Sequence, residues 1–182
     1  MLTEGSSEMK TISEGLVHVY TGNGKGKTTA ALGLAIRAAG RGFPVFIGQF
    51  MKGVVYGELA IEKFTGGLVQ IRQFGTDSLV HTANENDRRL AKAGLNTCRE
   101  AIQSGKYAIC MLDEVNIAIH MGLLNVKSVV EVVQNRPRGV EVVLTGRYAP
   151  QEILNLADYI SEMIEIRHPY QKGIPAREGI ER

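Results

Sequence analysis

The sequence predicts an α/β protein built on a doubly wound, mostly parallel sheet of six strands. Short apolar runs alternate with longer helix-forming segments, a pattern typical of strands joined by crossover helices. Some of these runs are apolar without alternation, as expected for strands that helices cover on both faces. A glycine-rich turn joins the first run to a helix-forming segment. We expect a flexible arm at residues 1–14 and one domain at 15–182, long enough for a substantial core.

The elements follow from apolar runs and from the residues that end them. Gly40 and Gly105 are expected to end helices, and Asn125 to cap one. The stretch 82–85 has the form of a capping box and predicts the start of a long helix. The last strand alternates more than the others and is expected at an edge. Strands are expected at 16–20, 45–49, 68–73, 107–114, 140–145 and 159–166, and helices at 27–39, 58–64, 82–104, 116–124, 126–134 and 150–157.

The glycine-rich turn reads Thr21-Gly22-Asn23-Gly24-Lys25-Gly26-Lys27-Thr28-Thr29. Glycines let successive backbone N–H groups point at phosphate oxygens, and the following helix adds its positive end. Lys27 can reach a phosphate as a point charge, and the Thr28 hydroxyl is placed to bind Mg²⁺. A glycine-rich turn with a chance Gly-Lys-Thr ending is the alternative, which the strand-to-helix context disfavours. Thr21 stands where such loops usually carry glycine, so the sequence predicts a modified P-loop.

Polar residues follow three other predicted strands. Asp113 and Glu114 end a buried run, where an acid in a P-loop protein holds Mg²⁺ directly or through water; an ordinary strand-to-turn junction is the alternative. Arg147 follows the fifth strand and is expected to reach a phosphate from the opposite wall. Lys52 follows the second strand and either approaches a phosphate or substrate carboxylate, or is a solvated loop lysine. The carboxyl ends of parallel strands share one edge, so we expect these residues near the loop.

Composition excludes several other classes of protein. The net charge of +2 gives no electrostatic case for a nucleic-acid partner. No apolar run approaches membrane-spanning length, and the N-terminus lacks a signal-peptide core, so a cytoplasmic protein without a membrane partner is expected. Cys98 and Cys110 have no ligand-like spacing and are interpreted as buried thiols in a reducing compartment.

Several segments beyond the loop extend the pattern. In order and spacing they resemble the P-loop ATP:corrinoid adenosyltransferases, over roughly residues 15–181. The matching segments are 21–31, 49–53, 75–76, 112–114, 145–147, 153–158, 168–170, 173–176 and 179–180.

This resemblance implies transfer of the 5′-deoxyadenosyl group of ATP to the cobalt of a reduced corrinoid (cob(I)alamin or a precursor), with release of triphosphate. The loop from Gly22 to Thr28 would hold the triphosphate, with the nucleotide reversed relative to other P-loop enzymes. Lys27, Thr28 and Glu114 would serve catalysis, Thr28 and Glu114 would bind Mg²⁺ with Asp113 in support, and Arg147 would contact the nucleotide. The resemblance also implies a homodimer, an N-terminal segment over the corrinoid, a reductase partner, and a role in adenosylcobalamin synthesis or salvage.

One segment departs from the family pattern. Asp77-Ser78-Leu79-Val80 stands where relatives carry Phe and Trp in Gly-Phe-Thr-Trp. Those rings help displace the lower cobalt ligand, so the resemblance implies that this loop limits the reduction of cobalt(II). Two other functions stay open: a P-loop ATPase or phosphotransferase, in which the second acid orients water, and a protein that binds ATP or corrinoid with weak or no catalysis.

Overall fold

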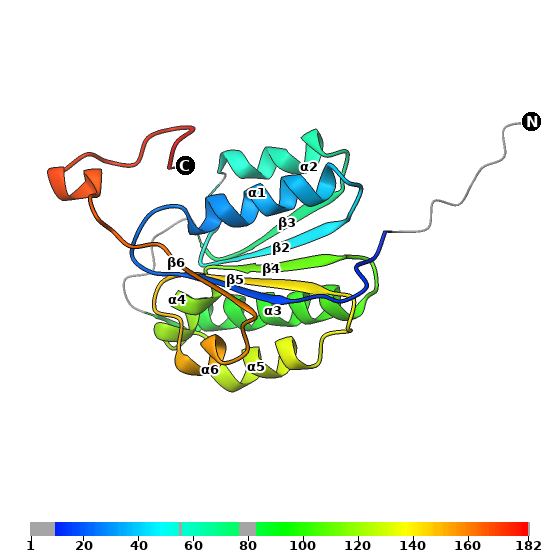
Figure 1. Ribbon diagram of the computed structural model, residues 1–182. Coiled ribbons are helices and arrows are strands. Elements are labelled where there is room, and N and C mark those ends of the chain that lie inside the picture. The colour runs from blue at the N-terminus through cyan, green and yellow to red at the C-terminus, as the bar shows by residue number, and fades with distance from the viewer. Residues whose placement is uncertain (1–9, 55, 77–82, 182) are drawn as a thin grey trace, which may run out of the picture.

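The computed structural model describes residues 10–54, 56–76 and 83–181 (Figure 1). Within these residues six strands form one sheet in the order β3-β2-β4-β5-β1-β6, and each pair of neighbours runs parallel. The predicted doubly wound α/β fold is therefore confirmed, with a sheet that is parallel throughout. The strands are β1 (Val17–Thr21), β2 (Val45–Phe50), β3 (Val69–Phe74), β4 (Ile109–Asp113), β5 (Glu141–Thr145) and β6 (Tyr159–Glu162).

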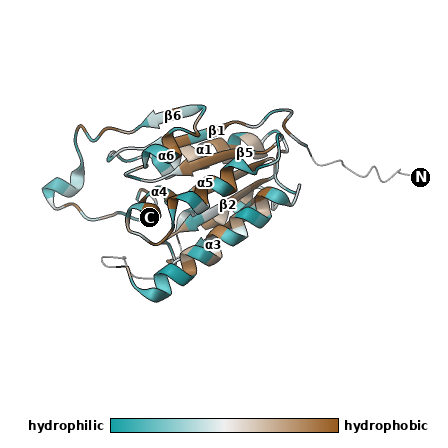
Figure 2. Ribbon diagram, turned by 90° about the horizontal axis from the view of Figure 1, so that it is seen from below, coloured by the Kyte–Doolittle hydropathy of each residue, from teal (hydrophilic) through white to brown (hydrophobic). Residues whose placement is uncertain are grey.

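Helices cover both faces of the sheet and make two apolar cores. Helices α1 (Lys27–Ala39) and α2 (Ile61–Phe64), with the preceding 3₁₀ turn η1 (Gly57–Ala60), lie on one face (Figure 1). The outer surface of the long helix on the other face is mostly hydrophilic (Figure 2). The second face carries α3 (Glu85–Gln103), α4 (Val115–His120), α5 (Val126–Gln134) and α6 (Gln151–Leu154).

Some predicted boundaries are wrong for identifiable reasons. Helix α3 is capped by Asn84, whose side chain accepts from the N–H of Asp87 at 3.0 Å while Asp87 accepts from the N–H of Asn84 at 3.2 Å. This reciprocal pair starts the helix later than the predicted cap at Thr82, which lies outside the described residues. The helices predicted at 116–124 and 150–157 are shorter, because turns take over after His120 and Leu154.

The last strand also ends earlier than predicted. Glu162 pairs with Thr21, and β1 stops there because the glycine loop begins. The backbone of Met163 still bonds to Thr21 and Gly24, but the strand does not continue past the start of the glycine loop, and the tail leads on to a 3₁₀ turn η2 (Pro169–Lys172). The predicted edge position of this strand is confirmed, because among the described strands β6 pairs only with β1.

The predicted N-terminal arm is described only from residue 10 onward. Lys10 donates to the carbonyl of Arg41 at 2.7 Å, and Ile12 packs against the core on the α1 face. This end of the arm therefore contacts the domain, and the flexibility of the rest stays a prediction. No helix in the described ranges has the length and apolarity needed to cross a bilayer.

Candidate active site

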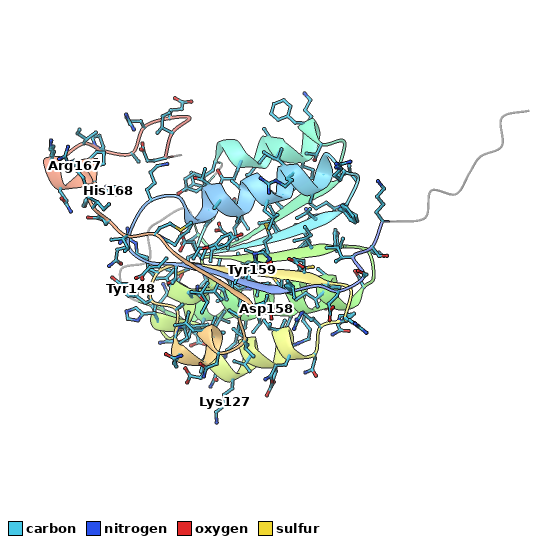
Figure 3. All side chains as sticks on the ribbon, viewed as in Figure 1. Lys127, Tyr148, Asp158, Tyr159, Arg167 and His168 are labelled. Atoms are coloured by element: carbon cyan, nitrogen blue, oxygen red, sulfur yellow. The ribbon has the colours of Figure 1, made fainter. Side chains whose placement is uncertain are left out.

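The predicted site residues meet at the carboxyl edge of the sheet. The glycine loop joins β1 to α1, the acid pair lies at the end of β4, Lys52 follows β2, and Arg147 follows β5. Tyr148, Arg167 and His168 lie on this same side of the molecule (Figure 3). Because all six strands are parallel, the edge collects residues that are far apart in sequence.

Close backbone packing requires glycine at positions 22 and 24 of the loop, and a positive φ favours it at position 26. The Gly24 N–H donates to the carbonyl oxygen of Met163 at 2.6 Å. A Cβ atom on Gly22 or Gly24 would lie only 2.5 or 2.7 Å from that oxygen, so the loop can pack on the chain after β6 only without side chains there. Gly26 has φ +120° with open space around it, and the N-terminus of α1 has no side-chain cap. The first-turn N–H groups of α1 therefore suit an anion.

The predicted phosphate-binding side chains separate into buried and exposed ones. Lys27 is only 7% exposed and donates to the carbonyls of Gly22 at 2.8 Å and Gly24 at 2.7 Å. Burial lowers the pKa of Lys27; the charge of Glu114 opposes this effect, and that of Arg147 adds to it. The exposed side chains of the loop and of the first turn of α1 are Asn23, Lys25 and Thr29.

Asp113 is the buried centre of a hydrogen-bond network. Its side chain is 1% exposed, and each of its two carboxylate oxygens accepts hydrogen bonds from two donors. Oδ1 accepts from the hydroxyls of Thr28 at 2.8 Å and Thr145 at 2.7 Å. Oδ2 accepts from Gln49 Nε2 at 3.2 Å and Lys52 Nζ at 2.9 Å. A carboxylate has about four acceptor positions, so protein donors use the full capacity of Asp113.

Glu114 has a different environment. Its backbone is left-handed, with φ 62°, and its N–H donates to the Thr145 hydroxyl at 2.9 Å. The part of the chain that the structure describes offers its carboxylate no hydrogen-bond donor. Burial and then the charge of Asp113 raise the pKa of Glu114, while Lys52, Lys27 and Arg147 oppose the rise. The structure thus brings Glu114 into the field of three cations and leaves its oxygens available to a ligand.

The donor set fits Mg²⁺. Thr28, Asp113 and Glu114 supply oxygen atoms, the ligands that this hard cation prefers, and Mg²⁺ usually keeps several waters. The Lys52 ammonium already forms an ion pair with Asp113. The described ranges contain no group of three or more His, Cys, Asp or Glu residues able to hold a metal. The residues therefore suit an ion completed by phosphate oxygens and water.

Sequence reasoning gave no role to Gln49, Thr145 or Tyr148. Gln49 and Thr145 are fully buried polar residues near the carboxyl ends of apolar strands. A polar residue in such a position needs a hydrogen-bond partner, and this requirement could have identified both as site residues from the sequence. Tyr148 is 50% exposed, has φ 60°, and stacks on His120 with ring centroids 4.3 Å apart. No local pattern indicated it. The segment 77–80, expected to limit cobalt(II) reduction, lies outside the described residues.

Comparison with known proteins decides the family. The model of the ATP:corrinoid adenosyltransferase BtuR/CobO/CobP family matches residues 13–182. The chain belongs to this family. The resemblance inferred from the loop and the edge segments is thereby confirmed.

Individual relatives agree with this assignment. A corrinoid adenosyltransferase of Sinorhizobium sp is 36% identical over 176 residues, covering 94% of this chain and 82% of the relative. A corrinoid adenosyltransferase of Escherichia coli K12 is 34% identical over 169 residues, covering 92% and 85%. Among solved structures, the KaiC-like protein PH0186 of Pyrococcus horikoshii OT3 has a TM-score of 0.56 at 20% identity, covering 84% of this chain and 74% of that one. This last likeness concerns the fold alone.

Proposed function

We propose that this protein transfers the 5′-deoxyadenosyl group of ATP to the cobalt of a reduced corrinoid and releases triphosphate, in cobalamin metabolism. The observation that carries the proposal is the family match over residues 13–182, with the loop and acid pair of that family assembled at one edge of the sheet. In the reaction a cobalt–carbon bond forms at C5′ and the C5′–oxygen bond breaks. The bonding electron pair leaves with the triphosphate, and cobalt(I) becomes cobalt(III).

Cobalt(I) is itself the nucleophile, so the protein needs no serine, cysteine or histidine to attack. Its tasks are to align cobalt with C5′ and to stabilise charge on the leaving triphosphate. Lys27, the loop N–H groups and Arg147 supply positive charge for the second task. Thr28 and Glu114 would hold Mg²⁺, with Asp113 in support, and the ion would neutralise further negative charge on the triphosphate. The Thr21 variation supports a loop that takes the nucleotide in reversed orientation.

The exposed edge strand supports a homodimer. Tyr159 and Ile160 of β6 are 52% and 54% exposed, Ile164 after the strand is 72% exposed, and the outer edge of β6 pairs with no other described strand. An apolar edge strand of this kind invites pairing with another chain. A second copy that covers β6 would also bury the start of the C-terminal tail.

A separate electron donor, a reductase, is part of the proposal, because the chain's own thiols are poorly suited to reduce cobalt. Burial raises the pKa of Cys110 to about 12, and burial also raises the pKa of Cys98. Both cysteines are free and buried, which supports a reducing, cytoplasmic location.

One assay tests the reaction. Chemically reduced cobalamin, ATP and Mg²⁺ are mixed with the protein, the cobalt absorbance is followed, and the phosphate products are identified. We expect adenosylcobalamin and triphosphate in equal amounts. ADP and phosphate would instead indicate a hydrolase or phosphotransferase, and binding of both substrates without a cobalt–carbon bond would indicate a non-catalytic protein.

A further inference from the structure

Backbone packing fixes the position of Lys52 at the carboxyl edge. Met51, directly after β2, has φ 58°, a conformation uncommon for a residue with a side chain, and its N–H donates to the carbonyl of Phe74 at 3.0 Å. A Cβ on Gly75 would overlap the backbone nitrogen of Lys52, and a Cβ on Gly53 would lie 2.6 Å from the carbonyl carbon of Thr76. The loops after β2 and β3 therefore pack closely against each other, and this packing holds Lys52 at the carboxyl edge.

The ammonium of Lys52 lies among acceptors and against Asp113. Nζ is 2.9 Å from Asp113 Oδ2 and 3.4 Å from Glu58 Oε1, and it lies 5.5 Å from the centroid of the Tyr56 ring. Gln49 Nε2 bridges the same two carboxylates, at 3.1 Å from Glu58 and 3.2 Å from Asp113. The side chain of Lys52 is only 17% exposed, so this is not a solvated loop lysine.

The charge balance explains why a cation belongs there. Asp113 is almost completely buried, and an ionised carboxylate in that position needs a partner charge. Burial tends to lower the pKa of Lys52, but the charge and hydrogen bond of Asp113, with Glu58, outweigh it and raise the pKa. Among the described cations, Lys52 makes the only ion pair with Asp113.

An incoming Mg²⁺ would compete with this pair. Thr28 and Glu114, the residues that would hold the ion, lie beside Asp113: the Thr28 hydroxyl is 2.8 Å from Asp113 Oδ1, and Glu114 is the next residue in the chain. Two cations on one carboxylate repel each other at short range, so the ion and the Lys52 contact disfavour one another.

We propose that Lys52 is the internal counter-ion of Asp113 in the metal-free protein and gives up this contact when Mg²⁺ binds. The inference rests on the proposed function, since it places the metal beside the acid pair. It also separates Lys52 from Lys27: Lys52 sets how readily the site accepts the metal and does not hold the phosphates of metal-free ATP.

Two variants test the proposal on the full-length protein. Lys52→Gln removes the charge but keeps a hydrogen-bond donor for Asp113, whereas Lys52→Arg keeps the charge. Lys63→Gln is the matched control, because it makes the same charge change at an exposed position on α2. Binding of Mn²⁺ alone is measured by paramagnetic resonance, thermal unfolding is followed with and without Mg²⁺, and binding of ATP is measured in the presence of a chelator.

We expect Lys52→Gln to bind Mn²⁺ about tenfold more tightly than the parent, because a like charge next to the ion is gone. Its Tm without metal should fall, and Mg²⁺ should raise that Tm more than it raises the parent's. Binding of metal-free ATP should not change. The Arg variant and the Lys63 control should resemble the parent in all three measurements.

Two results would overturn the inference: Mn²⁺ affinity that is unchanged or weaker in Lys52→Gln, or weaker binding of metal-free ATP, which would make Lys52 a phosphate ligand. Equal tightening of Mn²⁺ binding in the Arg variant would also overturn it, because charge would not be the cause. Failure of the proposed function looks different. In that case the parent protein forms no adenosylcobalamin. If the parent forms adenosylcobalamin with Mg²⁺ but Lys52→Gln has unchanged Mn²⁺ affinity, only the role of Lys52 is refuted.

Discussion

Replacing Thr145 by valine removes one hydroxyl from the centre of the site while nearly keeping the shape of the side chain. That hydroxyl makes two contacts: it donates to Asp113 Oδ1 at 2.7 Å and accepts from the Glu114 N–H at 2.9 Å. Thr145 is fully buried, so water does not easily take its place. The change therefore takes one donor from a buried carboxylate and one acceptor from a strained backbone amide.

The expected cost follows from these two contacts. A hydrogen bond to a charged group contributes about 1.5–3 kcal/mol, and a buried amide left without an acceptor costs about 1–3 kcal/mol. The two contributions are not additive because both contacts are made by one hydroxyl, so we expect a total loss of about 2–4 kcal/mol in the free energy of unfolding. For a chain of this length, each kcal/mol lowers Tm by about 2–4 °C.

The assay is urea unfolding of the parent, Thr145→Val and Thr145→Ser, with Thr97→Val as the control. Thr97 is a half-buried residue on α3 whose hydroxyl donates to the Ala93 carbonyl of its own helix at 3.1 Å near the surface, so its replacement should cost less than about 0.5 kcal/mol. Thr145→Ser keeps the hydroxyl and should retain most of the stability. If the free energy of unfolding of Thr145→Val lies within about 0.5 kcal/mol of the parent's, the hydrogen bonds of Thr145 to Asp113 and Glu114 do not stabilise the fold.

Four further predictions concern the reaction and the assembly. Lys27→Ala should nearly abolish kcat/KM for ATP, because the triphosphate loses its principal side-chain charge. Glu114→Gln should raise the Mg²⁺ concentration needed for half-maximal turnover, because an amide is a poorer ligand for a hard cation. Ile160→Lys should convert a dimer to a monomer in light scattering, because it places charge on the exposed edge strand. Ser78→Phe with Val80→Trp should raise turnover from cobalt(II) much more than turnover from chemically prepared cobalt(I), since rings exclude water and the lower ligand.

Each of these predictions has a clear contrary result. Near-normal kcat/KM in Lys27→Ala would remove the phosphate-loop assignment, and an unchanged metal titration would exclude Glu114 as a direct ligand. Phe64→Lys, at an 83% exposed position on α2, is the control for the edge strand. If both Ile160→Lys and Phe64→Lys are monomers, or if neither is, the dimer contact does not lie specifically at β6. Equal effects on both cobalt states would show that the loop 77–80 does not control reduction.

The class of fold and the phosphate-loop motif could both be predicted from local sequence patterns. Apolar runs and turn glycines are local features of the sequence. Burial on both faces of a sheet favours apolar residues at each strand position, and a tight turn favours glycine at the position of the turn. The predicted α1 and α5 match the observed bounds, and the strand predictions differ from the observed strands mainly at their ends. The loop from Thr21 to Thr29, read with the segments that follow other strands, was enough to predict the family.

The different environments of the two acids, in contrast, depend on how the chain folds. From sequence, Asp113 and Glu114 are adjacent and chemically alike, yet one has all four acceptor positions filled and the other has left-handed backbone and open oxygens. The donors to Asp113 come from α1, β2, the loop after β2 and β5, up to 85 residues away. Their convergence depends on the strand order β2-β4-β5. This order places β4 between β2, which precedes it by many residues in the sequence, and β5, which follows it by many residues. Local sequence patterns do not give the strand order. The hydrogen-bond partners of Asp113, and the pairing of Lys52 with Asp113, could therefore be known only from the folded chain.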